Sequence, residues 1–128
     1  MDDIFGYIND PAQRYSIQKT LAIIDKQVEL IRPYKVRLAA YEGGQHLVHY
    51  KTRSKQQHPN PILFAANRDP RMETAYIDLL KGLKQRGLVL FMAFSSPRPN
   101  AFWGAWGIKE YLNQPDSETP KYRAIMKF

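Results

Sequence analysis

The sequence predicts an α/β fold with at least two parallel strands and three helices, in the order helix, strand, helix, strand, helix. Apolar residues recur with a helical period in two long stretches, and each stretch is followed by a short segment with the pattern of a β-strand. A helix of about 15 residues between the strands favours a right-handed parallel crossover. The chain has 128 residues, which is the size of one domain, so we expect residues 1–128 to fold as a single unit.

The first long helix is predicted to begin at residues 9–11, where Asn-Asp-Pro offers a capping side chain followed by proline. Its apolar stripe, at helical spacing, consists of Ile17, Leu21, Ile24, Val28 and Ile31. Pro33 ends this helix. Residues 35–40 then place their larger apolar side chains at every second position, which predicts the first strand.

The second long helix is predicted to follow residues 67–70, where Asn-Arg-Asp-Pro repeats the chemistry of a helix start. Gly87 caps its end, and its apolar face consists of Met72, Tyr76, Leu79, Leu80 and Leu83. Residues 88–94 are continuously apolar, the pattern of a parallel strand that is buried on both faces. Residues 42–68 are predicted to form a long loop, either functional or mobile.

The composition excludes several classes of site. The chain has no cysteine, which rules out disulfide bonds and thiolate chemistry. No apolar run reaches the roughly 18 residues of a membrane span, and the acidic first residues lack the pattern of a signal peptide. Localisation stays open, with the cytoplasm as the default. Phosphate, dinucleotide and serine-hydrolase motifs are missing, and the histidines lack a zinc-site spacing, so we expect neither a cofactor nor a metal.

The net charge of +7 is concentrated in residues 32–60, which carry six basic side chains and one acidic side chain. Within this segment, residues 50–58 combine an aromatic ring with lysine and arginine, a pattern that suits single-stranded nucleic acid. One alternative function is therefore a small basic nucleic-acid-binding or accessory protein that uses residues 50–58. The same residues also fit a solvated loop, and a structural subunit without a ligand is a third alternative.

A carboxylate stands at the end of the first predicted strand, in the string Tyr-Glu-Gly-Gly-Gln-His at residues 41–46. Glu42 would lie at the carboxyl end of a parallel strand, where the active sites of barrel enzymes lie. The two glycines that follow let the backbone turn sharply. Glu42 is therefore a candidate nucleophile, and the alternative is a carboxylate that pairs with Arg68 or Arg71 or caps a turn.

Polar and aromatic residues around this carboxylate could complete a sugar site. The polar candidates, which both donate to and accept from hydroxyl groups, are Gln45, His46 and Asn67. The aromatic candidates, whose flat faces suit the C–H faces of a pyranose, are Tyr41, Trp103 and Trp106. The alternatives are that the polar side chains order the loop and its turns, and that the tryptophans pack in the core beside Phe94.

Local strings of this chain also carry a resemblance. They are Tyr-Glu-Gly-Gly-Gln-His-Leu at 41–47, Asn-Arg-Asp-Pro-Arg-Met at 67–72 and Trp-Gly-Ala-Trp-Gly at 103–107, with a closing Thr-Pro-Lys-Tyr-Arg-Ala at 119–124. In this order they resemble the C-terminal part of a (β/α)8-barrel glycoside-hydrolase-like domain. Such domains occur in poorly characterised bacterial proteins, some of which are labelled cellulose-binding. The resemblance corresponds to the last quarter to third of a barrel.

The resemblance implies that Glu42 is the nucleophile of a retaining glycosidase, active or vestigial, and that Trp103 lines the sugar site. Retaining hydrolysis also needs an acid residue, which in such barrels comes from the fourth strand, and this chain has no counterpart of it. We therefore expect a glycosidase-derived carbohydrate-interacting domain that is incomplete for catalysis on its own. The expected partners are a carbohydrate and either a second copy of the chain or a missing N-terminal portion.

Overall fold

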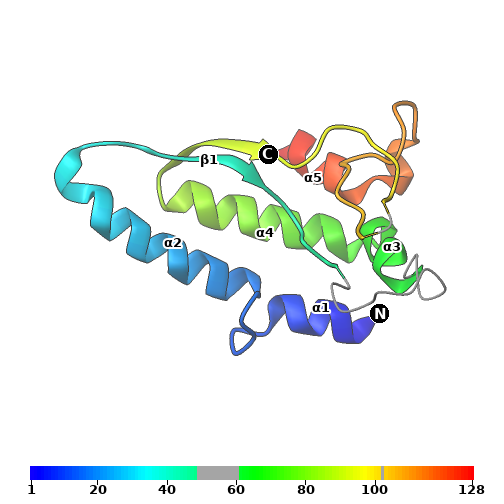
Figure 1. Ribbon diagram of the computed structural model, residues 1–128, viewed down its shortest axis with the longest axis horizontal. Helices are drawn as coiled ribbons and strands as arrows, with labels where there is room; N and C mark the ends of the chain where they lie inside the picture. The colour runs from blue at the N-terminus through cyan, green and yellow to red at the C-terminus, as the bar shows by residue number, and fades with distance from the viewer. Residues whose placement is uncertain (49–60, 102) are drawn as a thin grey trace.

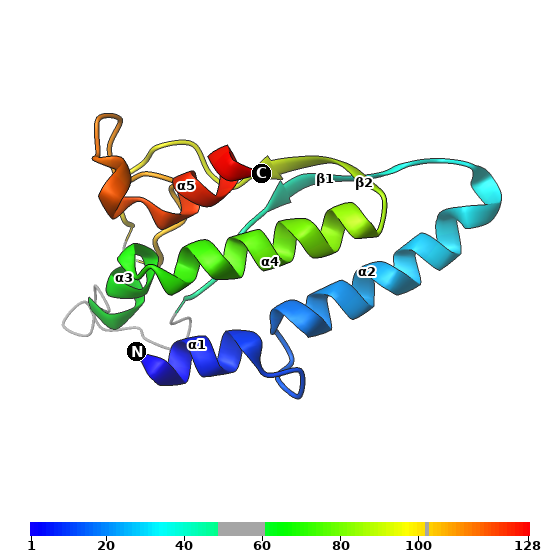
Figure 2. The same cartoon turned by 180° about the vertical axis from the view of Figure 1, so that it is seen from behind.

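The structure, a computed structural model, describes residues 1–48, 61–101 and 103–128 (Figure 1). Within these residues it has five α-helices and one sheet of two parallel strands. This arrangement confirms the predicted α/β class and the alternation of helices and strands. The molecule is elongated, with α2 and α4 running along its length (Figures 1 and 2).

Two helices precede the first strand, α1 (Asp2–Asn9) and α2 (Ile17–Ile31). The predicted start at residues 9–11 is wrong, because Asp10 accepts the Ala12 N–H at 2.9 Å in the turn between the helices. The true cap is Ser16, whose hydroxyl accepts the Lys19 N–H at 3.2 Å. The predicted apolar stripe is confirmed, because its five residues are the buried or half-buried ones of α2.

The first strand, β1 (Leu38–Gly43), starts and ends three residues later than predicted. After α2 the chain makes a 3-10 turn, η1 (Arg32–Tyr34), and Lys35 takes a left-handed conformation with φ of 54°. Since a residue in that conformation cannot belong to a strand, regular pairing begins only beyond it. The strand therefore continues through Glu42, which puts that carboxylate on the strand itself.

The connection predicted at 42–68 is shorter than expected. Its first two residues belong to β1, and its last eight form α3 (Pro61–Arg68), while residues 49–60 lie outside the described part. Proline is well suited to the first turn of a helix and alanine has the highest helix propensity, which explains α3. The loop prediction missed it because the helix is too short to show a clear apolar period.

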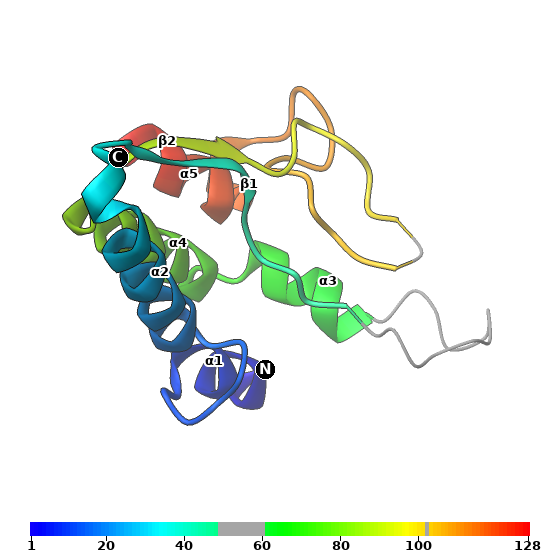
Figure 3. The same ribbon diagram turned by 60° about the vertical axis from the view of Figure 1, so that its left-hand side comes forward.

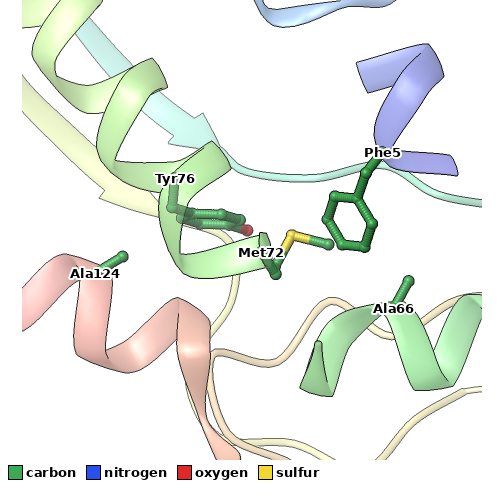
Figure 4. Packing of buried hydrophobic residues seen from close by; sticks show 5 residues of the cluster. All are labelled: Phe5, Ala66, Met72, Tyr76 and Ala124. Carbon is green, nitrogen blue, oxygen red and sulfur yellow. The ribbon is translucent and has the colours of Figure 1, made fainter. Parts of the chain in front are cut away.

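The central element is α4 (Arg71–Gln85), which starts where Asp69 accepts the Arg71 N–H at 2.9 Å. Its predicted apolar face is confirmed, and Gly87, at φ of 81°, follows its end as predicted. Four helices contribute to the buried cluster, and Figure 4 shows the side chains, which are Phe5, Ala66, Met72, Tyr76 and Ala124. Leu21 of α2 packs on Gly82 of α4.

The second strand, β2 (Leu88–Ala93), pairs in parallel with β1, and the two lie as one layer over the helices (Figure 3). The prediction that this strand is buried on both faces is wrong. Val89, Leu90 and Met92 are 51%, 52% and 54% exposed. The reason is that a single layer of two strands has no second layer of helices over it within the described residues.

The chain ends with η3 (Asp116–Glu118) and α5 (Pro120–Lys127). Glu73 of α4 joins α5 to the core, because its carboxylate pairs with Arg123 at 2.7 Å and with Lys127 at 2.6 Å. Between β2 and α5 the backbone folds back on itself. The Ser95 N–H donates to the Trp106 carbonyl at 3.0 Å, and the Ile108 N–H donates to the Ser95 carbonyl at 2.9 Å. This pairing brings residues 104–108 to the carboxyl ends of the strands.

Candidate functional site

A cavity of about 430 Å³ lies where β1 and β2 end. In parallel sheets of α/β proteins, ligands bind at the carboxyl ends of the strands, so the position is chemically meaningful. The Phe94 N–H donates to the Gly43 carbonyl at 2.8 Å, and this hydrogen bond keeps the ends of the two strands together. The residues that line the cavity are Glu42, Gly43, Gly44, Gln45, His46, Phe94, Arg98 and Trp106.

The turn at the cavity depends on Gly44, whose φ is +151°. A Cβ atom at this position would lie 2.8 Å from the Tyr76 hydroxyl and 3.0 Å from the Phe94 carbonyl oxygen. Both distances are too short for a carbon atom, and the backbone conformation itself favours glycine. This close approach lets the Tyr76 hydroxyl accept a hydrogen bond from the backbone N–H of the next residue, Gln45.

Gln45 positions this turn through hydrogen bonds to residues of other described segments and to the chain just beyond it. Its backbone N–H donates to the Tyr76 hydroxyl at 3.0 Å. Its amide nitrogen donates to the Asn67 side-chain oxygen at 3.0 Å and to the Ala105 carbonyl at 2.5 Å, while its amide oxygen accepts the Leu47 N–H at 2.6 Å. Burial raises the pKa of Tyr76 to about 12, so the phenol acts as a neutral hydroxyl.

Asn67 lies behind Gln45 and is only 6% exposed. Its amide nitrogen donates to the Leu63 carbonyl at 2.8 Å, one turn earlier in α3. It lines a second, much smaller cavity rather than the one at the strand ends. Within the described residues, Asn67 therefore holds Gln45 in place and has no direct access to the larger cavity.

Glu42 faces the larger cavity without a partner, since its carboxylate has no hydrogen bond or ion pair within the described part of the chain. The alternative that it pairs with Arg68 or Arg71 is wrong. Arg68 is bound to Glu110 at 2.6 Å, and Arg71 is bound to carboxylates of its own, that of Asp69 among them. Glu42 is thus a free acceptor at the carboxyl end of a strand.

Trp106 and His46 form a hydrogen-bonded pair in the cavity wall. The indole N–H donates to His46 Nδ1 at 3.2 Å, and the ring centroids are 5.9 Å apart. Because an indole N–H only donates, Nδ1 is the accepting nitrogen in this contact. The other nitrogen, Nε2, is then the one that can donate to a ligand. Phe94 lies edge-on to Trp106, with ring centroids 6.4 Å apart, but Trp106 is only half-buried and does not belong to the buried cluster.

The structure does not assemble the three predicted aromatic residues into one surface. Trp106 lines the cavity, whereas Tyr41 and Trp103 are not among the described residues that line it. Tyr41 is 82% exposed on β1 and Trp103 is 48% exposed in the returning loop. The aromatic part of the cavity wall is therefore Trp106 with Phe94.

Sequence reasoning missed Arg98, which lines the cavity from the loop after β2. Its guanidinium carbon lies 5.8 Å from the centroid of the Trp106 ring. One signal could have found it. Loops that follow neighbouring parallel strands gather at one end of the sheet, so a charged residue a few positions after the second strand should lie near Glu42.

The basic segment, a metal site and a membrane span were also considered from the sequence. The basic segment 50–58, on which the nucleic-acid alternative depends, is outside the described part, as are His49 and His58. Among residues 1–48, 61–101 and 103–128, no three acidic or histidine side chains gather in a way that could hold a metal ion. No helix in those ranges has the length and apolarity to cross a membrane.

Comparison of the chain with models of protein families, with curated proteins and with solved structures found no match. Function therefore has to be argued from the cavity itself.

Proposed function

We propose that this chain is a glycosidase-derived carbohydrate-interacting domain that binds its ligand in the cavity at the ends of β1 and β2. The observation that carries the proposal is that the unpaired carboxylate of Glu42 lines the same cavity as Trp106 and His46. The resemblance of residues 41–47 to the strand end of a barrel glycosidase supports the same reading.

The chemistry of the cavity suits a sugar. A sugar ring offers hydroxyl groups that both donate and accept, together with apolar C–H faces. Glu42 accepts, Nε2 of His46 donates, and the rings of Trp106 and Phe94 provide apolar wall. The volume of about 430 Å³ lies within the range of small-molecule pockets.

Hydrolysis by this chain alone is not part of the proposal. Retaining glycosidases need two carboxyl groups about 5 Å apart, and Glu42 is the carboxylate among the described residues that line the cavity. Glu110 lines the smaller cavity instead and is bound to Arg68. If a partner supplied the acid, Glu42 would be the nucleophile, and Glu42→Gln would abolish turnover while leaving sugar binding largely intact.

The proposal includes a partner strand. In a sheet of two strands, each strand has one edge without a neighbour in the described structure, and such edges pair readily with further strands. The strand would come from a second copy of the chain or from an N-terminal portion. Equilibrium sedimentation of this chain distinguishes the two, because a strictly monomeric protein would exclude the second copy.

Tryptophan fluorescence tests the proposal, because Trp106 lines the cavity and Trp103 does not. In the variant Trp103→Phe, Trp106 is the reporter, and we expect a saturable shift on titration with one class of soluble oligosaccharide. The matched variant Trp106→Phe keeps an aromatic ring but leaves the reporter outside the cavity, so its signal should change much less. Isothermal titration calorimetry measures binding in both variants independently of the reporter.

Two results would count against the proposal. If folded Trp103→Phe protein responds to no sugar, the cavity is not a sugar site and the reading as a structural subunit takes its place. If Trp106→Phe gives the larger response, ligand binds elsewhere on the surface, near Trp103.

A further inference from the structure

Arg98 provides the positive charge among the described residues that line the cavity. Within the described part of the chain its guanidinium has no hydrogen bond and no ion pair, whereas Arg68, Arg86 and Arg123 are all ion-paired. Its contact with the ring of Trp106, at 5.8 Å, is a cation–π contact that holds the charge at the cavity wall. The five N–H donors of the guanidinium are therefore available to a ligand.

The backbone determines where Arg98 lies. Its N–H donates to the Lys109 carbonyl at 3.0 Å, in the same backbone pairing that carries Trp106 to the cavity. A Cβ atom on Gly107 would lie 2.6 Å from the Arg98 carbonyl oxygen and 3.1 Å from its Cγ atom. Because glycine allows this close approach, the backbone and the first atoms of the Arg98 side chain lie against the returning loop, although the residue as a whole is exposed.

Glu42 and Arg98 line one cavity, yet they do not pair with each other. A neutral sugar would satisfy the Glu42 carboxylate through its hydroxyl groups but would offer the guanidinium no charged acceptor. A sugar that also bears a negative group satisfies both, since the planar fork of arginine matches carboxylate and sulfate geometry. The net charge of +7 would draw an anionic ligand toward the protein.

We propose that the cavity is selective for an anionic sugar, whose charged group binds Arg98 while its hydroxyl groups reach Glu42. This inference rests on the proposed carbohydrate function and names its substrate class. The carboxylate of a uronic acid and the sulfate ester of a sulfated sugar share this chemistry, and the experiment separates them.

The probes are trimeric oligouronates of several stereochemistries, their methyl esters, and sulfated trisaccharides, with affinity measured by isothermal titration calorimetry. A methyl ester keeps the sugar skeleton and removes the charge. We expect at least one anionic probe to bind the wild-type protein about tenfold more tightly than its neutral counterpart, as one hydrogen-bonded charge pair would give. Arg98→Gln should reduce that ratio to about twofold or less.

Two further variants sharpen the test. Arg98→Lys keeps the charge but loses the fork, so its ratio should fall between those of the wild-type and glutamine proteins. The matched control is Arg14→Gln, because Arg14 also lies over an aromatic ring, that of Tyr15, at 5.2 Å, and does not line the cavity. It removes the same unit of charge and should leave the ratio unchanged. Circular dichroism verifies that each variant is folded.

The remaining outcomes of these titrations either contradict part of the proposal or identify which anionic group binds. A preference for charge that survives Arg98→Gln, or that Arg14→Gln lowers equally, would overturn the role of Arg98 in favour of general attraction. Equal binding of acids and esters would overturn the selectivity but leave the carbohydrate function standing. Failure of every sugar to bind would overturn both. A sulfated probe that ranks first and loses its advantage in Arg98→Gln assigns the sulfate ester, whereas a uronate assigns the carboxylate.

Discussion

Two cavities lie on the neighbouring residues Trp106 and Gly107, and the charged side chains that line them differ in whether they are ion-paired. The larger, about 430 Å³, is lined by Glu42 and Arg98, and neither of these has an ion-pair partner within the described residues. The smaller, about 10 Å³, is lined by Glu110 and Lys121. Glu110 accepts two hydrogen bonds from Arg68, at 2.6 and 2.7 Å, so its charge is matched inside the protein.

Lys121 likewise has its polar group bound within the protein. It is 3% exposed and donates to the Ala105 carbonyl at 2.9 Å, the same oxygen that accepts the Gln45 amide. The comparison teaches that a charged residue near a strand end is not by itself a ligand contact. Charged side chains that form ion pairs or hydrogen bonds within the protein stabilise the fold. Charged side chains that face a cavity without such a partner are the ones that can bind a ligand.

The largest effect is expected at Gly44, on which both cavities depend because it lets Tyr76 hold Gln45. Gly44→Ala would place a methyl group 2.8 Å from the Tyr76 hydroxyl in a strained conformation. We expect the free energy of unfolding to fall by roughly 3 kcal/mol, measured by urea denaturation. The matched control is Gly6→Ala in α1, where nothing lies within 4 Å. This change should raise the free energy of unfolding by up to about 1 kcal/mol.

If Gly44→Ala had the same free energy of unfolding as the wild-type protein, the assigned role of the turn would be contradicted.

The second effect concerns the buried charge of the smaller cavity. Burial lowers the pKa of Lys121 to about 8, while its unfolded value is about 10.4. Between these values the unfolded chain binds more protons, so the free energy of unfolding should rise as the pH increases from about 8 to 10. The rise should be on the order of 2 kcal/mol. Lys121→Met should remove it, as urea denaturation across this pH range would show. Identical slopes in the two proteins would argue against a buried charged lysine.

The smallest effect compares the two carboxylates directly. Glu110→Gln breaks a partly buried pair and should lower the free energy of unfolding by about 1 kcal/mol at pH 7. Arg68 holds the pKa of Glu110 below its usual value, so this contribution should fade as the pH falls below about 4. Glu42→Gln removes a carboxylate without a described partner and should change stability by less than about 0.5 kcal/mol. A loss in Glu42→Gln as large as in Glu110→Gln would remove the distinction between the two cavities.

Local patterns predicted the two long helices, missed the short helices α1 and α3, and predicted the strands only in part. The periodic stripes of α2 and α4 were identified because each residue of a helix contributes independently to one face. The first strand was displaced by three residues because the left-handed conformation of Lys35 leaves no clear mark in the sequence. The exposure of β2 was missed because an apolar run shows only that a strand can be buried, not that a second layer covers it.

The part of the candidate site whose residues are neighbours in the sequence could be predicted. Glu42, Gln45 and His46 follow one another at a strand end, so reading along the chain found them together. Trp106 was recognised as aromatic, but its place opposite His46 depends on the backbone pairing with Ser95. Arg98 carried no motif and was missed for that reason.

The sequence by itself determined that two helices present apolar faces, that a carboxylate ends a parallel strand, and that no thiol chemistry is available. These are local or compositional properties, set by neighbours a few positions apart. Only the tertiary structure decided that Gln45 and Asn67 bind each other, that Glu110 is matched by Arg68, and that Glu42 and Arg98 are left facing a cavity. Pairing of charges depends on distances through space between segments far apart in the chain, 42 residues in the case of Arg68 and Glu110, and the packing of α3 against the returning loop sets that distance.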